Sequence, residues 1–140
     1  MPTASGAALG LTIRANPSEV WADQPVEYTL ALVNQSAGPI RGVILLDPLP
    51  ADLDPGAIIS GAGATWRDRI LRVEKEELAP GERLEIVFQA LVGAKLPSGA
   101  AVVNRVSASA AGGLQASASA TIAMPPPELP RVGGGDDAER

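Results

Sequence analysis

Three aspartates, Asp47, Asp52 and Asp54, stand close together among prolines. Carboxylate oxygens are ligands that Ca²⁺ takes in proteins, roughly six to eight oxygens per ion. The spacing does not match an EF-hand loop, and aspartates beside prolines commonly cap turns. We therefore expect these side chains to cap and solvate a loop, with a calcium site as the alternative.

Asn34 and Asn104 are candidates for a different chemistry, an intramolecular crosslink between a lysine amine and an asparagine amide. That reaction needs a buried lysine with a carboxyl group next to it. Lys75 and Lys95 are the lysines of the chain, and both lie in polar or loop sequence. We therefore expect each asparagine to bond backbone groups at a strand end, as short amide side chains often do.

Trp66 stands close to three arginines, Arg67, Arg69 and Arg72. An indole ring can stack on a sugar or a cation, and guanidinium groups bind anions through paired hydrogen bonds, so these residues are a candidate sugar- or anion-binding face. The interpretation we favour places Trp66 in the core of an aromatic-poor protein and the arginines on its wet side. Trp21 is expected to close one end of the fold.

The chain lacks the residue types that most catalytic mechanisms need. It contains no cysteine and no histidine, which excludes disulfides, thiol nucleophiles and imidazole bases. The acidic pairs Glu76-Glu77 and Asp136-Asp137 have no apolar neighbours that would raise a carboxyl pKa. No Ser-x-x-Lys motif or cofactor fingerprint occurs, so the sequence predicts a protein that is not an enzyme and binds no cofactor.

Composition narrows the class of protein further. A chain of 140 residues with 46% hydrophobic residues fits one globular domain with tails. Only 3% of the residues are aromatic, so packing must come mainly from aliphatic side chains. The formal charge of −5 and the absence of a basic run argue against nucleic acid as a partner. No apolar run of about 18 residues is present, which argues against membrane insertion.

Apolar residues alternate with polar ones along much of the chain, which is typical of half-buried strands. Strands are expected at residues 9–13, 26–32, 40–46, 57–60, 84–90, 102–108 and 114–122, and residues 65–74 are expected to form another strand or a hairpin. Asp54-Pro55-Gly56 is expected to form a turn, and residues 67–69 a bend.

This pattern predicts an all-β, antiparallel, immunoglobulin-like sandwich of seven or eight strands, with an open barrel as the alternative. The expected core residues are Leu11, Ile13, Val26, Tyr28, Leu30, Leu32, Ile86, Phe88, Val106 and Ile122.

Four short motifs follow one another along these strands. They are Tyr28-Thr29 leading to Asn34, Asp47-Pro48-Leu49-Pro50, Leu78-Ala79-Pro80-Gly81-Glu82, and Val103-Asn104-Arg105-Val106. In this order they resemble the conserved surface-protein repeat known as domain of unknown function eleven, a bacterial and archaeal immunoglobulin-like module. The resemblance covers residues 9 to 122. The glycine usual in the family two residues after the first asparagine is Ser36 here, so a longer turn is expected.

The resemblance implies a non-catalytic structural spacer or adhesion module of a cell-surface or extracellular protein. Its partners would be copies of itself or neighbouring surface domains, and possible ligands include carbohydrate. One alternative is a self-assembling filament or coat subunit that uses strand addition, for which the edge strand 114–122 and Leu9-Gly10-Leu11 are the candidate segments. A second alternative is a ligand-binding module built around Trp66.

The flanks differ in composition from the strands. Residues 1–8 are expected to form a flexible lead, residues 9–122 the sandwich, and residues 123–140 a Pro/Gly-rich linker or tail. Leu129-Pro130-Arg131-Val132-Gly133 is similar to a sortase signal in which Val132 replaces threonine, and a linker is the interpretation we favour. Residues 1–6 lack the basic start and apolar core of a signal peptide. We therefore expect a processed or excised part of an exported protein, or else a cytoplasmic chain.

Overall fold

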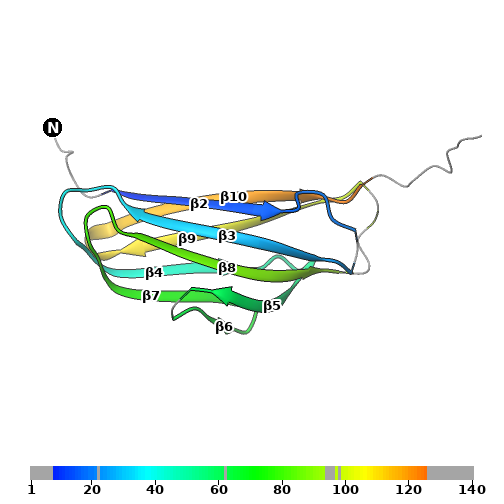
Figure 1. The fold of residues 1–140 in the computed structure, drawn as a ribbon, viewed down its shortest axis with the longest axis horizontal. Helices are drawn as coiled ribbons and strands as arrows, with labels where there is room; N and C mark the ends of the chain where they lie inside the picture. Colours follow the sequence, from blue (N-terminus) through cyan, green and yellow to red (C-terminus); the bar gives the residue numbers. More distant parts are fainter. Residues whose placement is uncertain (1–7, 22, 62, 94–96, 98, 126–140) are drawn as a thin grey trace, which may run out of the picture.

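The computed structural model describes residues 8–21, 23–61, 63–93, 97 and 99–125. In this part of the chain, two antiparallel sheets pack face to face (Figure 1). The fold is an all-β, immunoglobulin-like sandwich, so the predicted fold class is confirmed. Among the described residues, no helix has the length and apolar character needed to cross a membrane.

Each sheet is defined by its strand order. The four-stranded sheet runs β2 (Leu9–Asn16), β3 (Pro25–Asn34), β8 (Arg83–Val92) and β5 (Leu53–Ser60). The five-stranded sheet runs β10 (Leu114–Ala123), β9 (Ala101–Ala110), β4 (Ile40–Pro48), β7 (Ile70–Leu78) and β6 (Thr65–Arg67). A 3-10 turn, η1 (Ala111–Gly113), joins β9 to β10.

The described residues contain nine strands because the segment from Thr65 folds as a hairpin rather than as one strand. Strands β6 and β7 pair through Trp66 and Leu71, and the bend falls at residues 67–69 as expected. Asp68 takes a φ of 58°, the left-handed conformation that a tight bend needs and that aspartate tolerates.

The expectation of a turn at Asp54-Pro55-Gly56 is wrong, since these residues lie inside β5. The proline is tolerated because β5 is the last strand of its sheet and carries register shifts between Pro55 and Ser60. A Cβ atom on Gly56 would lie 2.6 Å from the carbonyl oxygen of Gln89, so glycine lets β5 approach β8 closely.

The core lies between the two sheets and is formed by alternate residues of each strand. Of the ten expected core residues, all but Leu11 are buried; Leu11 is half-buried on the edge strand β2 and packs against the core. Three aromatic rings meet there. Tyr28 stacks on Phe88 with centroids 5.5 Å apart, and Trp66 meets Phe88 edge-on at 5.4 Å.

The first and last described strands lie side by side and run in the same direction (Figure 1). The segment that follows β2 bonds the end of β10, with Val20 N donating to Ala123 O at 3.0 Å and Ala123 N to Ser18 O at 2.9 Å. The start of β2 and the end of β10 therefore lie at opposite ends of the long axis (Figure 1).

The sandwich extends beyond the predicted boundary at residue 122. Ala123 belongs to β10, and Met124 is buried in the core. The rest of the predicted tail, residues 126–140, lies outside the described residues, together with Leu129-Pro130-Arg131-Val132-Gly133 and Asp136-Asp137. Residues 1–7 of the predicted lead lie outside them as well.

Candidate functional site

Three polar residues are completely buried in the described part of the sandwich: Asn34, Asp47 and Asn104. Each belongs to one of the four sequence motifs that carry the family resemblance. Burying a polar group costs free energy unless hydrogen bonds compensate for the lost water. The bonds that each of these side chains makes therefore show what it contributes.

Asp47 and Asn104 form a pair between neighbouring strands. Asp47 has the inward phase of β4, and Asn104 has the inward phase of β9. Strands β4 and β9 pair through Leu45 and Ala108, which brings the two side chains together. The Nδ2 atom of Asn104 donates to Oδ2 of Asp47 at 2.9 Å.

Burial dominates the electrostatics of this pair. It raises the pKa of the Asp47 carboxyl to about 7, and the hydrogen bond from Asn104 acts in the opposite direction. Burial also raises the pKa of Tyr28, on β3 of the opposite sheet, and the negative charge of Asp47 raises it further. Among the described residues, no lysine or arginine forms an ion pair with Asp47.

Three buried atoms around this pair make no hydrogen bond to the described protein atoms. They are Oδ1 of Asp47, Oδ1 of Asn104 and the hydroxyl oxygen of Tyr28. Each such atom costs about 1–3 kcal/mol when it has no partner. The acid, the amide and the phenol are thus polar groups within a largely apolar core, and the charge of Asp47 acts on Tyr28.

A carboxyl group beside an asparagine amide meets one requirement of a lysine–asparagine crosslink. The amine is not supplied by Lys75, whose Nζ atom lies 3.3 Å from Glu82 on the surface. Lys95 lies outside the described residues. The expectation that Asn104 bonds backbone groups is wrong, because its partner is the Asp47 carboxyl.

Asn34 has the role expected for it. Its Nδ2 atom donates to the carbonyl oxygens of Gly38 and Leu78, each at 2.8 Å. Its Oδ1 atom accepts from the backbone N–H of Ser36 at 2.8 Å. The side chain thus holds the turn after β3 and ties it to the end of β7.

The structure separates the three candidate calcium ligands. Asp47 points into the core, Asp52 is exposed, and Asp54 pairs with Arg69 at 3.1 Å. The described residues contain no group of three or more acidic side chains placed to hold a metal ion.

The candidate binding face around Trp66 is also divided. The indole Nε1 of Trp66 donates to Gly56 O at 2.8 Å, and the ring contacts Phe88 in the core. Arg69 Nη2 donates to Pro50 O at 2.9 Å and also to Leu53 O.

The other two arginines have a different environment. Arg72 pairs with Glu74, while Arg67 is exposed on β6. Arg67 and Arg72 therefore lie on the solvent-facing side, as expected. The indole of Trp66 is not exposed beside them. Trp21 is 46% exposed, so the expectation that it closes one end of the sandwich is wrong.

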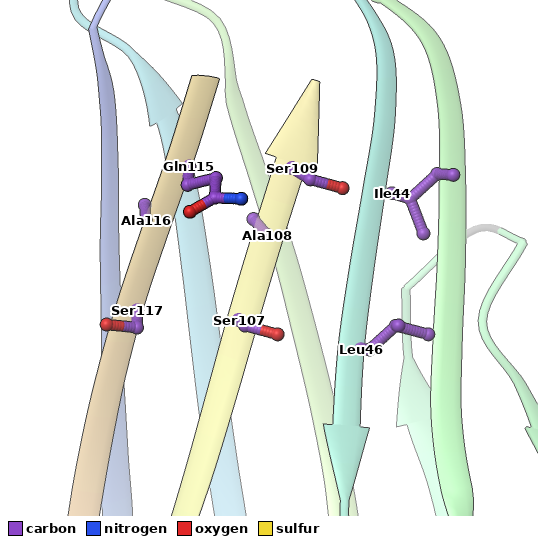
Figure 2. A pocket seen from close by; sticks show the side chains of 8 residues that line it. All are labelled: Ile44, Leu46, Ser107, Ala108, Ser109, Gln115, Ala116 and Ser117. Carbon is purple, nitrogen blue, oxygen red and sulfur yellow. The ribbon is translucent and has the colours of Figure 1, made fainter. Parts of the chain in front are cut away.

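A shallow surface depression of about 510 Å³ lies on the outer face of β4, β9 and β10. Figure 2 shows Ser107 and Ser109 next to Ile44 and Leu46, with Gln115 on the neighbouring strand. None of the residues that line it is titratable. The depression offers hydroxyl and amide groups for hydrogen bonds but no acid or base.

Sequence reasoning missed the Asp47–Asn104 pair, although two signals were present. Asn104 shares the inward phase of Val102 and Val106, and Asp47 shares that of Val43 and Leu45. A polar residue at an inward position of a strand needs a buried partner. Sequence alone did not indicate that the two residues are partners.

Comparison with known proteins reveals likeness in fold but not in sequence. No family model and no curated protein matches the chain. Among solved structures, BcpA, the major pilin subunit of Bacillus cereus, is similar with a TM-score of 0.60 at 8% identity, over 85% of this chain and 40% of that one. The major pilin SpaD of Corynebacterium diphtheriae has a TM-score of 0.59 at 10% identity, over 81% of this chain and 34% of that one.

A third similar structure is a single domain. It is the CARDB domain of a Pyrococcus furiosus protein in complex with di-metal ions, with a TM-score of 0.52 at 12% identity. The match covers 84% of this chain and 88% of that one. The chain thus spans less than half of the length of the two pilins and most of the CARDB domain. At these identities, the likeness concerns the fold.

Proposed function

We propose that this domain is a non-catalytic structural spacer or adhesion module of a cell-surface or extracellular protein. The observation that carries the proposal is that the start of β2 and the end of β10 lie at opposite ends of the long axis (Figure 1). A domain of this kind adds its length to a chain of domains. Strands of ten residues, such as β3, span about 33 Å at roughly 3.3 Å per residue.

Two further observations support the proposal. Two of the similar structures are major pilin subunits, and this chain matches 40% of the length of one and 34% of the other. The residues of the resemblance to domain of unknown function eleven include Asn34, Asp47 and Asn104, which are the buried polar residues of the described fold. We infer membership of that repeat family from this agreement between motif and core.

A filament or coat subunit is the second candidate function. Both segments proposed for strand addition lie in edge strands, residues 114–122 in β10, as expected, and Leu9-Gly10-Leu11 in β2. These two edges lie against each other, so an added strand would first have to separate them. This arrangement favours the spacer. The third candidate, a ligand-binding module around Trp66, has less support because the indole is turned towards Phe88.

Light scattering coupled to size-exclusion chromatography tests the proposal. A spacer should elute with the mass of one chain over a wide range of concentrations. Two copies in tandem should have a maximum dimension in solution scattering that exceeds that of one copy by about 33 Å or more. Polymers formed by the single chain would contradict the spacer and favour the filament subunit.

A further inference from the structure

The surroundings of Asp47 offer little that could stabilise a negative charge. The carboxyl group is completely buried and accepts one hydrogen bond, from the neutral amide of Asn104. On the other side, β7 places Leu71 opposite Asp47 in the strand register. Across the core, Tyr28 is the titratable group that senses the charge. A buried carboxylate without a counter-ion is expensive, and such groups usually become neutral instead.

Each residue of the pair has one buried oxygen that makes no hydrogen bond to the described protein atoms. Nδ2 of Asn104 already donates to Oδ2 of Asp47, and the remaining atoms are Oδ1 of Asn104 and Oδ1 of Asp47. If Asp47 is ionised, both remaining oxygens are acceptors and repel each other. If Asp47 carries a proton on Oδ1, that hydroxyl can donate to Oδ1 of Asn104. The acid and the amide then satisfy each other through a ring of two hydrogen bonds.

We propose that Asp47 is a neutral carboxylic acid in the folded domain and that its pairing with Asn104 makes the stability of the sandwich depend on one buried proton. Loss of this proton leaves a charge between the sheets that no lysine or arginine of the described residues pairs with. The folded domain therefore loses stability as the pH rises from mildly acidic to neutral, because the unfolded chain releases this proton more readily.

The direction of the pH effect follows from proton binding. Burial raises the pKa of Asp47 from 3.8 to about 7, so the folded chain binds more protons than the unfolded chain between these values. Stability then falls as the pH rises through this window. The neutral form of Asp47 contributes its full stabilisation below about pH 4, and this contribution is lost above about pH 7. A difference of about three pKa units corresponds to roughly a thousandfold change in the folding equilibrium constant.

The variant Asp47→Asn tests the proposal because its amide imitates the neutral acid. The introduced amide could both donate to and accept from Asn104 without titrating. We would measure the folding equilibrium of wild type and variant by urea unfolding between about pH 4 and pH 9. The folding equilibrium constant of the variant, divided by that of wild type, should increase by up to roughly a thousandfold as the pH rises. Other carboxyl groups titrate alike in both proteins, so the ratio isolates Asp47.

A second measurement needs no variant to fold. The side-chain carboxyl carbon of Asp47, followed by NMR in the wild-type protein, should titrate near pH 7 or show no titration before unfolding. Asp52→Asn, which removes an exposed carboxyl five residues away, is the matched control and should leave the pH dependence of stability unchanged. Titration of Asp47 below about pH 5, or a constant ratio between Asp47→Asn and wild type, would overturn the proposal.

Discussion

The side-chain amide of Asn34 donates to the carbonyl oxygen of Leu78 at 2.8 Å, although 44 residues separate them in the chain. Two backbone hydrogen bonds accompany it. Gly81 N donates to Asn34 O at 2.8 Å, and Asn34 N donates to Glu82 O at 3.0 Å. The turn Leu78-Ala79-Pro80-Gly81-Glu82 is therefore fastened to the end of β3. Two motifs that stand far apart in the sequence form one structural unit.

The stability of this unit should depend strongly on Asn34. The substitution Asn34→Ala removes the buried bond to Leu78 O and the half-buried bonds to Gly38 O and the N–H of Ser36. We expect the free energy of unfolding to fall by about 2–4 kcal/mol, as measured by urea denaturation. Gln35→Ala, at the exposed neighbouring position, is the control and should change it by less than about 0.5 kcal/mol. Equal effects of the two substitutions would contradict this role.

The core position of Leu30 can be tested against an exposed leucine. Leu30 is completely buried, whereas Leu91 is 45% exposed. Leu30→Ala should lower the free energy of unfolding by about 2–5 kcal/mol, because it removes buried methyl groups and leaves a cavity. Leu91→Ala removes the same atoms at the surface and should cost well under half as much in the same thermal or urea experiment. A reversed order would be incompatible with the sheet faces described above.

Glycine substitutions test how closely β5 approaches β8. A Cβ atom on Gly56 would lie 2.6 Å from Gln89 O, so Gly56→Ala must push the two strands apart. We expect a loss of about 1–3 kcal/mol in unfolding free energy. Gly38 has open space around its Cα and no left-handed φ, so Gly38→Ala should be neutral or stabilise by about 0.5 kcal/mol. A tolerated alanine at residue 56 would show that the strands are farther apart.

Removal of the Tyr28 hydroxyl should not weaken the domain. The oxygen is buried and has no hydrogen-bond partner among the described residues, so Tyr28→Phe removes a polar atom while it keeps the ring stacked on Phe88. The free energy of unfolding should stay unchanged or rise by about 1 kcal/mol. A loss of more than about 1 kcal/mol would mean that the hydroxyl has a partner, such as an internal water molecule.

The ionisation of Tyr28 provides a further test, because it is the only tyrosine of the chain. Burial and the nearby Asp47 raise its pKa. Free tyrosine is half ionised at about pH 10, but the folded chain should show no phenolate absorbance there. The absorbance should appear together with unfolding, as followed by circular dichroism on the same sample. A phenolate that forms while the sheets are intact would contradict the burial of this hydroxyl.

Much of the fold could be predicted because alternation along a strand reports directly which side is buried. The phase of Val26, Tyr28, Leu30 and Leu32 placed them correctly in the core. Local turn signals were less dependable. Asp54-Pro55-Gly56 reads as a turn by residue type, yet an edge strand accepts a proline and the bulged approach to β8 needs the glycine.

The candidate site was less predictable because it depends on contacts between distant residues. The sequence marked Asp47 and Asn104 separately, but grouped Asp47 with Asp52 and Asp54, its neighbours along the chain. Strand pairing instead brings Asp47 to Asn104, 57 residues away. Trp66 was expected in the core because few aromatic residues were available to fill it; it is half-buried and packs against the core through Phe88. The exposure of Trp21 was not foreseen, because no alternation surrounds it.

The parallel course of β2 and β10 has a mechanical consequence. Tension applied between Leu9 and Ala123 acts along the strands, while the ladder hydrogen bonds lie across them. This tension shears the β2–β3 and β9–β10 ladders. All hydrogen bonds of a ladder then bear the load together and do not break one after another. The bonds from Ser18 and Val20 to Ala123 join the two pulled strands directly. A chain of such domains would transmit a stretching force before any single domain gave way.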